Sequence, residues 1–115
     1  MQFYQEGNEM TKTAEALDEM ALRSLLEELP GWIKMPGRDA ITITYGLADF
    51  PSAIGLMADI APEAEALNHH PELFNVYNKL TVTLTTHDLG GLSTLDAALA
   101  RLIHARALAA GASVL

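Results

Sequence analysis

The chain contains no cysteine and few basic residues, and these two shortages narrow its possible functions first. Without cysteine it can form neither a disulfide framework nor a cysteine-ligated zinc site. Its 115 residues include seven Lys or Arg against fifteen Asp or Glu, a formal net charge of −8. Because binding to a phosphate backbone depends on basic side chains, we do not expect direct contact with nucleic acid.

Long hydrophobic runs are also missing, although half of the residues are hydrophobic. Charged residues or proline break the apolar stretches every few positions, so no segment predicts a membrane span. The first ten residues, MQFYQEGNEM, lack the basic and apolar regions of a signal peptide. The sequence therefore predicts a cytoplasmic protein that does not associate with a membrane.

The length is that of about one domain. Residues 1–12 are polar and without pattern, which predicts a mobile leader, and residues 13–115 are expected to form a single domain. Leucines at helical spacing between residues 22 and 29 predict a first helix, with Thr13 or Asp18 as its N-cap. Strands over residues 32–35 and 41–47 follow, joined by a turn.

The second half of the domain repeats the helix and the strand pair and adds a last helix. Asp49 caps a helix in which Pro62 predicts a kink or a restart, because proline lacks an amide donor and crowds the preceding turn. Strands over 74–76 and 80–84 and a helix over 95–106 complete the order. The sequence thus predicts an α+β fold of order αββαββα, a four-stranded antiparallel sheet with the helices packed on one face.

Three histidines, His69, His70 and His87, stand between the carboxylates Glu65 and Asp96. Histidine changes charge near neutral pH without help, so this cluster indicates proton-transfer chemistry. Its members fall at a helix end, a strand end and a helix start, which lets them converge on one site. If the second helix continues far enough, Glu65 and His69 share a face, and the carboxylate would favour a charged His69 that donates a proton.

Two further interpretations of the cluster remain open. Histidine and carboxylate are ordinary ligands of zinc and iron, so His69, His87 and Glu65 are a possible metal set. Adjacent histidines point apart, however, and we expect no metal. Asp96 follows Ser93 by three residues, the spacing of a capping box, so it can cap the last helix, contact a histidine or the substrate, or do both.

The spacing of these residues resembles the signature of the pterin-4a-carbinolamine dehydratases. The matching residues are Glu65-Ala-Leu-Asn-His69-His70-Pro71, then Tyr77, His87 and Asp96, with the flanking segments 29–32, 37–41 and 74–79. The resemblance extends over about residues 29–103. Leu73 departs from the family pattern, because the family often has a tryptophan there whose ring could pack against the pterin. Pro62 is a second departure, because it interrupts the helix that carries Glu65.

The resemblance implies that a 4a-hydroxy-tetrahydropterin loses water to give a quinonoid dihydropterin, in support of tetrahydrobiopterin recycling, without a cofactor or a metal. The catalytic residues that it implies are His69, His70, His87 and Glu65, and the substrate-binding residues are Asn68, Pro71, Thr85, Thr86 and Asp96. It also implies a homodimer or homotetramer and a functional link to an aromatic amino acid hydroxylase. The alternative is a dimerisation or coactivator module that binds a protein partner, a second role of animal members of the family.

Overall fold

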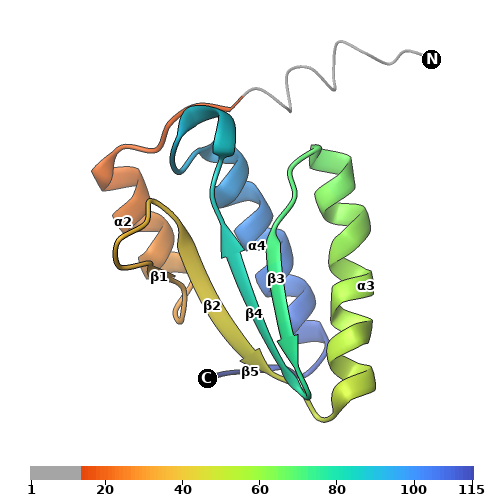
Figure 1. The fold of residues 1–115 in the computed structure, drawn as a ribbon. Coiled ribbons are helices and arrows are strands. Elements are labelled where there is room, and N and C mark those ends of the chain that lie inside the picture. The colour runs from red at the N-terminus through yellow and green to blue at the C-terminus, as the bar shows by residue number, and fades with distance from the viewer. Residues whose placement is uncertain (1–13) are drawn as a thin grey trace, which may run out of the picture.

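The computed structural model describes residues 14–115. The predicted leader over residues 1–12, and Thr13 as a possible N-cap, lie outside the described residues. The elements are α2 (Glu19–Glu28), β1 (Ile33–Lys34), β2 (Ile41–Gly46), α3 (Phe50–Leu67), β3 (Glu72–Val76), β4 (Lys79–Leu84), the short 3₁₀ helix η1 (His87–Leu89), α4 (Thr94–Ala109) and β5 (Ser113–Val114). Figure 1 shows α2, α3 and α4 on one side of the antiparallel sheet.

The strands pair in the order β1-β2-β4-β3, with β2 and β4 in register from Ile41 opposite Leu84 to Gly46 opposite Lys79. This confirms the predicted α+β fold with four antiparallel strands and helices on one face. The structure adds β5, which pairs with β2 and makes the sheet of residues 14–115 five-stranded. A two-residue strand is too short to carry an alternating pattern, so the sequence did not predict it.

Alternation along β2 and β4 decides which face of the sheet meets the helices. Ile41, Ile43 and Tyr45 point into the core, and the threonines between them lie on the opposite face. There Thr42 hydrogen-bonds the Thr83 hydroxyl at 2.9 Å across the strand pair. The largest fully buried side chains include Ile41, Tyr45, Leu56, Ile60, Leu80, Leu84, Leu99 and Ile103.

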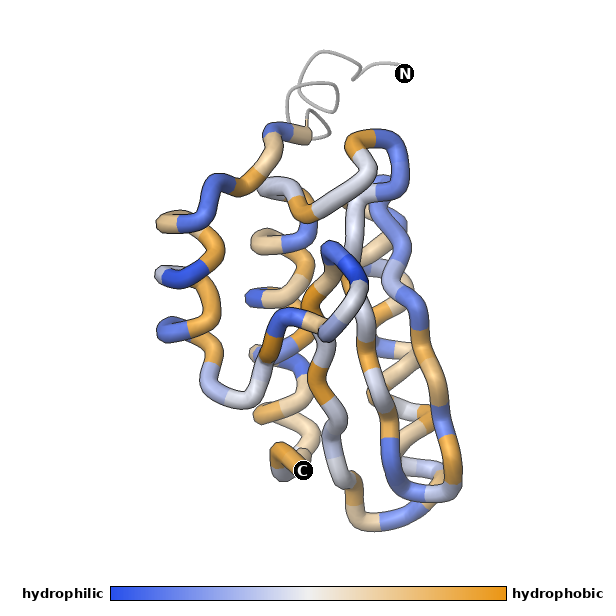
Figure 2. The backbone as a smooth tube through the Cα atoms, turned by 60° about the vertical axis from the view of Figure 1, so that its left-hand side comes forward, coloured by the Kyte–Doolittle hydropathy of each residue, from blue (hydrophilic) through white to orange (hydrophobic). Residues whose placement is uncertain are grey.

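The helices begin where local capping predicts. The Asp18 side chain accepts a hydrogen bond from the amide of Ala21 at the start of α2, and Asp49 accepts one from Ser52 at the start of α3. Figure 2 shows the hydrophobic positions of α2 on its inner side and the hydrophilic ones on its outer side. Within residues 14–115, no helix is both long and apolar enough to cross a membrane.

Pro62 lies inside α3, and the helix runs through it as one element, so the predicted restart is wrong. Proline removes one amide donor from the helix interior. Ile60 and Ala64 on either side of it are buried in the core, and this packing holds both halves of the helix in place. Glu65 consequently lies in the last turn of a continuous helix.

Gly31 joins the end of α2 to the sheet through a backbone that favours glycine, with φ +104°. A Cβ added there would lie 2.6 Å from Cγ1 of Val114 in β5. We expect Gly31→Ala to lower the free energy of unfolding by about 1–3 kcal/mol, because backbone strain and displacement of β5 add. The measurement is chemical denaturation, with Gly37→Ala as the matched control: Gly37 has φ +74° but no heavy atom within 4 Å of the added Cβ. Equal losses in the two variants would show that the contact with β5 contributes nothing.

Candidate active site

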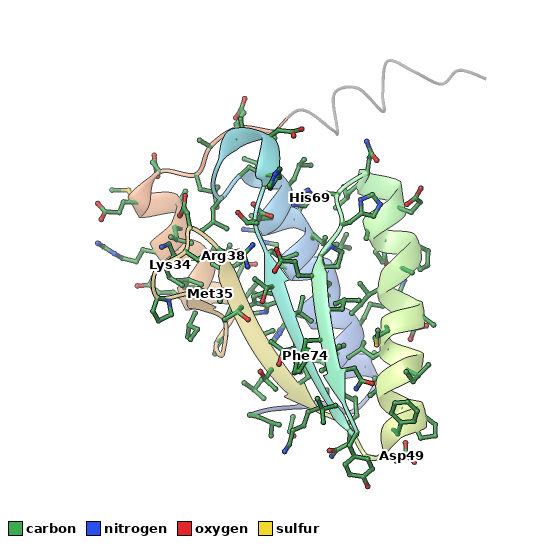
Figure 3. The ribbon with its side chains drawn as sticks, in the orientation of Figure 1. Lys34, Met35, Arg38, Asp49, His69 and Phe74 are labelled. Carbon is green, nitrogen blue, oxygen red and sulfur yellow. The ribbon has the colours of Figure 1, made fainter. Side chains whose placement is uncertain are left out.

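A hollow of about 460 Å³ lies at the end of the sheet where α3 stops and η1 and α4 start. Its volume is within the range of about 300–1,000 Å³ that is usual for small-molecule sites. The residues that line it are Ala14, Asn68, His69, His70, Thr85, Thr86, His87, Asp88, Leu89 and Leu95. Figure 3 places His69 at this end of the molecule, opposite Asp49.

Asn68 determines how the two adjacent histidines are presented. It ends α3 in the left-handed conformation, with φ 50°, which asparagine tolerates better than most residues. The amide of Asn68 bonds to the carbonyl of Glu65 and that of His69 to the carbonyl of Ala64, both at 3.0 Å. The chain therefore turns sharply after Leu67, and His69 points inward, 9% exposed, whereas the side chain of His70 is 61% exposed.

The two histidines take different carboxylate partners. His69 Nε2 lies 2.6 Å from Oδ1 of Asp96, and His70 Nε2 lies 2.9 Å from Oε1 of Glu65. The expectation that Glu65 serves His69 is therefore wrong. Because the helix ends at Leu67, His69 is no longer one helical turn along the same face from Glu65.

Asp96 is fully buried and forms the centre of a hydrogen-bond network. Its Oδ1 faces His69, and its Oδ2 accepts from the Thr86 hydroxyl at 2.7 Å and from the amide of Ser93 at 2.9 Å. Since the Thr86 proton goes to Asp96, the Ser93 hydroxyl donates to Thr86. Asp96 thus has both roles that the sequence left open: it completes the capping box of α4 and contacts a histidine.

This network favours one tautomer of the His69 ring, with a proton on Nε2. A buried carboxylate needs donors, and Asp96 receives them from Thr86, from Ser93 and from Nε2–H of His69. With Nε2–H donated to Asp96, Nδ1 is the nitrogen that can take up or release a proton. A carboxylate that holds one imidazole nitrogen in this way orients the ring and supports the positive charge that forms when the other nitrogen is protonated.

His87 is presented differently, on η1 in the short loop between β4 and α4. Thr86 and Gly91 close this loop through paired backbone hydrogen bonds of 2.9 and 3.2 Å. His87 is exposed, and among residues 14–115 its ring has no carboxylate partner, unlike His69 and His70. The site therefore combines a buried histidine on a carboxylate, an exposed histidine on a carboxylate and an exposed histidine without one.

The structure brings together most of the predicted site residues. Those that line the hollow are Asn68, His69, His70, Thr85, Thr86 and His87. Glu65, Pro71 and Asp96 do not line it; Glu65 and Asp96 stand behind histidines that do. Leu73 does not line it either but packs against the core.

Four lining residues were not predicted from the sequence: Ala14, Asp88, Leu89 and Leu95. Leu89 and Leu95 read as ordinary apolar residues of a loop and a helix. Ala14 belongs to a segment that crosses the start of α4, where the amide of Thr94 donates to the carbonyl of Glu15 at 2.8 Å. No local pattern signals such a crossing, because it depends on a contact between residues far apart in the chain.

A metal set of His69, His87 and Glu65 does not come together. Within the part of the chain that the structure describes, no group of three or more His, Cys, Asp or Glu side chains is placed to hold a metal ion. Glu65 faces His70, and the ring nitrogen of His69 nearest a carboxylate is engaged by Asp96. The arrangement is suited to proton transfer between side chains and a ligand in the hollow.

The comparisons with known proteins agree with one another, because each of them matches pterin dehydratases. The model of the pterin 4 alpha carbinolamine dehydratase family matches residues 15–106. Proteins of Burkholderia ambifaria and Burkholderia cenocepacia, both named "Putative pterin-4-alpha-carbinolamine dehydratase", are 52% identical over 81 residues, which is 70% of this chain and 79% of theirs. A crystal structure from Brucella melitensis, described as a transcriptional coactivator/pterin dehydratase, is 45% identical with a TM-score of 0.78, covering 81% of this chain and 99% of that one. The chain therefore belongs to the pterin 4 alpha carbinolamine dehydratase family.

Proposed function

We propose that this protein dehydrates a 4a-hydroxy-tetrahydropterin to a quinonoid dihydropterin and water by histidine acid–base catalysis. The observation that carries the proposal is the buried pair of His69 and Asp96, 2.6 Å apart, at the wall of a hollow that two further histidines line. Such a pair holds an imidazole in one tautomer and one orientation. Family membership supports the pterin as the substrate.

The reaction needs two proton transfers, one at each end of the double bond that forms between C4a and N5. The C4a–O bond breaks and the oxygen leaves as water after it gains a proton, while N5 loses its proton and forms a double bond to C4a. We assign the proton donor to His69, because Asp96 holds its Nε2–H and leaves Nδ1 to exchange the second proton. We assign the base at N5 to His87, whose ring has no carboxylate partner within residues 14–115.

The test is the rate of dehydration of enzymatically generated 4a-hydroxy-tetrahydropterin, followed by ultraviolet absorbance. We expect the wild-type protein to exceed the buffer rate and His87→Ala to lose about 10²-fold, near the lower end for one proton-transfer group, because water can replace an exposed imidazole. The matched control is His104→Gln. His104 lies on α4 outside the hollow, with Nδ1 2.7 Å from the Tyr45 hydroxyl, so its replacement should leave the rate unchanged.

Two results would contradict this function. A wild-type rate equal to that in buffer would refute the proposed dehydratase activity. An equal loss of rate in His87→Ala and His104→Gln would show that these histidines affect the rate by stabilising the fold and not by transferring protons. Circular dichroism of each variant excludes unfolding as the cause. The proposal includes tetrahydrobiopterin recycling beside an aromatic amino acid hydroxylase, the class of enzyme that produces such carbinolamines.

A second candidate is a dimerisation or coactivator module, which the description of the Brucella structure favours. In the described sheet β3 is an edge strand, and its Phe74 and Val76 are 66% and 55% exposed. A strand edge with apolar side chains supports association with another chain, including a homodimer or homotetramer. This candidate takes first place if the wild-type protein fails to accelerate dehydration.

A further inference from the structure

The hydroxyl group of Thr86 is directed away from the hollow, although the residue is part of its lining. Its proton goes to Oδ2 of Asp96 at 2.7 Å, and its oxygen accepts the proton of the Ser93 hydroxyl. Thr86 is 6% exposed, and Ser93 and Asp96 are fully buried, so these bonds are shielded from water. A threonine hydroxyl has a single proton, so this one has none left to donate to a ligand.

The chain around the two hydroxyl groups fixes them in place. The Ser93 oxygen accepts a hydrogen bond from the amide of Leu95 at 3.1 Å, as the N-cap of α4. The backbone of Ser93 also pairs with that of Ala16, in the segment before α2. Thr86 pairs through its own backbone with Gly91, at 2.9 and 3.2 Å. The hydroxyl chain that ends at the carboxylate is therefore held from both sides.

A donor at one oxygen of Asp96 changes how strongly the other oxygen holds the imidazole. The carboxylate shares one negative charge between Oδ1, which lies 2.6 Å from Nε2 of His69, and Oδ2, which accepts from Thr86. The Thr86 donor draws part of that charge to Oδ2, so the pair of His69 and Asp96 binds a further proton less tightly than it would without the donor. An imidazolium that is held less tightly gives up its proton more readily.

Other ionisable groups lie around the pair, on the segments packed against it. These are Glu15 before α2, Glu65 and His70 at the end of α3, and His87 and Asp88 on η1. All five are exposed, so solvent and salt screen their effect on the pair. Thr86 carries no charge, so its replacement by valine leaves each of these charges in place. A change in the titration of His69 in that variant would therefore report the lost hydrogen bond.

We propose that Thr86 is a positioning residue whose hydroxyl, fixed by Ser93, adjusts how strongly Asp96 holds the imidazole of His69. The proposal deepens the proposed function and rests on it where it treats His69 as the proton donor. It assigns the Thr86 side chain to the carboxylate and not to the pterin. The hydroxyl thus acts on the reaction through two other side chains and without contact with the reacting atoms.

The first experiment follows the imidazole nitrogens of His69 by ¹⁵N NMR as a function of pH, in the free protein. In Thr86→Val we expect the midpoint of the His69 titration to move to higher pH by about half a unit to one unit, because the carboxylate has lost a donor. Thr86→Ser keeps the hydroxyl and should restore the wild-type midpoint. The matched control is Thr44→Val, which removes a hydroxyl that pairs with Thr81 at 2.8 Å on the open face of the sheet and should change nothing.

The second experiment measures the pH dependence of dehydration in the same variants. The donor acts in its protonated form, so activity falls as pH rises through the midpoint, and a raised midpoint moves this fall to higher pH. We expect kcat of Thr86→Val at its optimum to drop by about three- to tenfold, because a more tightly held proton is transferred more slowly. KM should stay the same, because the hydroxyl does not contact the substrate.

Several results would overturn the proposal. One is an unchanged His69 midpoint in folded Thr86→Val, and another is an equal shift in Thr44→Val. A raised KM without a shift in the pH profile would also overturn it, because the hydroxyl would then contact the substrate. If Thr86→Val does not fold, Ser93→Gly decides: glycine is tolerated at an N-cap, and a smaller shift in the same direction is expected. The NMR titration needs no substrate, so a shifted midpoint without dehydration by the wild-type protein would support the role of Thr86 and refute only the proposed function.

Discussion

Replacement of His69 by glutamine is expected to lower kcat for dehydration by about 10²- to 10⁴-fold, the usual contribution of one acid–base group. Glutamine can place an amide N–H near the position of Nε2 and donate to Asp96, but it cannot exchange a proton at the position of Nδ1. The buried carboxylate therefore keeps a donor. We expect the free energy of unfolding to change by about 1 kcal/mol, the net contribution of an ordinary hydrogen bond.

Three measurements separate proton transfer from binding and from folding in His69→Gln. Single-turnover rates report the chemical step, calorimetry with a dihydropterin reports binding, and urea denaturation reports stability. Normal binding with a strongly reduced rate is the expected pattern. A rate within tenfold of wild type would show that His69 does not donate the proton, and His70 would become the candidate, since it also lines the hollow.

The largest expected loss of stability belongs to Asp96→Ala, at about 3–5 kcal/mol, the cost of removing one partner from a buried ionic pair. The substitution leaves three buried donors without their acceptor: the His69 ring, the Thr86 hydroxyl and the amide of Ser93. A small domain has about 5–15 kcal/mol of stability in total, so this variant would be close to unfolding near physiological temperature. Denaturation in urea measures the loss.

Two variants test whether burial causes this effect. Asp96→Asn keeps the shape and one carbonyl acceptor, so it should lose less stability than Asp96→Ala while still impairing catalysis through His69. Glu65→Ala breaks the exposed pair with His70, in which the two side chains are 77% and 61% exposed, and should change stability little. Similar small losses in Asp96→Ala and Glu65→Ala would mean that the network around Asp96 does not stabilise the fold.

Much of the fold was predictable because it depends on short-range patterns. Asp49 caps α3 through a residue three positions away, and the alternation of isoleucine and threonine in β2 has the period of a strand. The order of helices and strands along the chain follows from such patterns. β5 escaped prediction because its pairing covers two residues and is set by where the chain returns after α4.

The gathering of the candidate site residues at one hollow was predictable from the sequence, but their hydrogen-bond pairings were not. Histidines at element ends marked the hollow, yet the choice of partners depended on a single residue. Asn68 in the left-handed conformation ends α3 early and turns His69 away from Glu65 and toward Asp96. Asparagine after a helix is a known stop signal, so this turn could have been considered from the sequence. The distance between His69 and Asp96 could not be predicted from the sequence, since it depends on how α3 and α4 pack.

The double role of Asp96 has a consequence for how the protein loses activity. One carboxylate both caps α4 and holds the imidazole of His69, the proposed proton donor, so the first turn of that helix and the imidazole are expected to open together. Fluctuations that fray the helix start must also release the imidazole. The proposed proton donor is thereby tied to the integrity of a buried element, whereas the proposed base, His87, lies in a loop. We expect substitutions that weaken the first turn of α4 to reduce the fraction of molecules in which Asp96 holds the His69 ring.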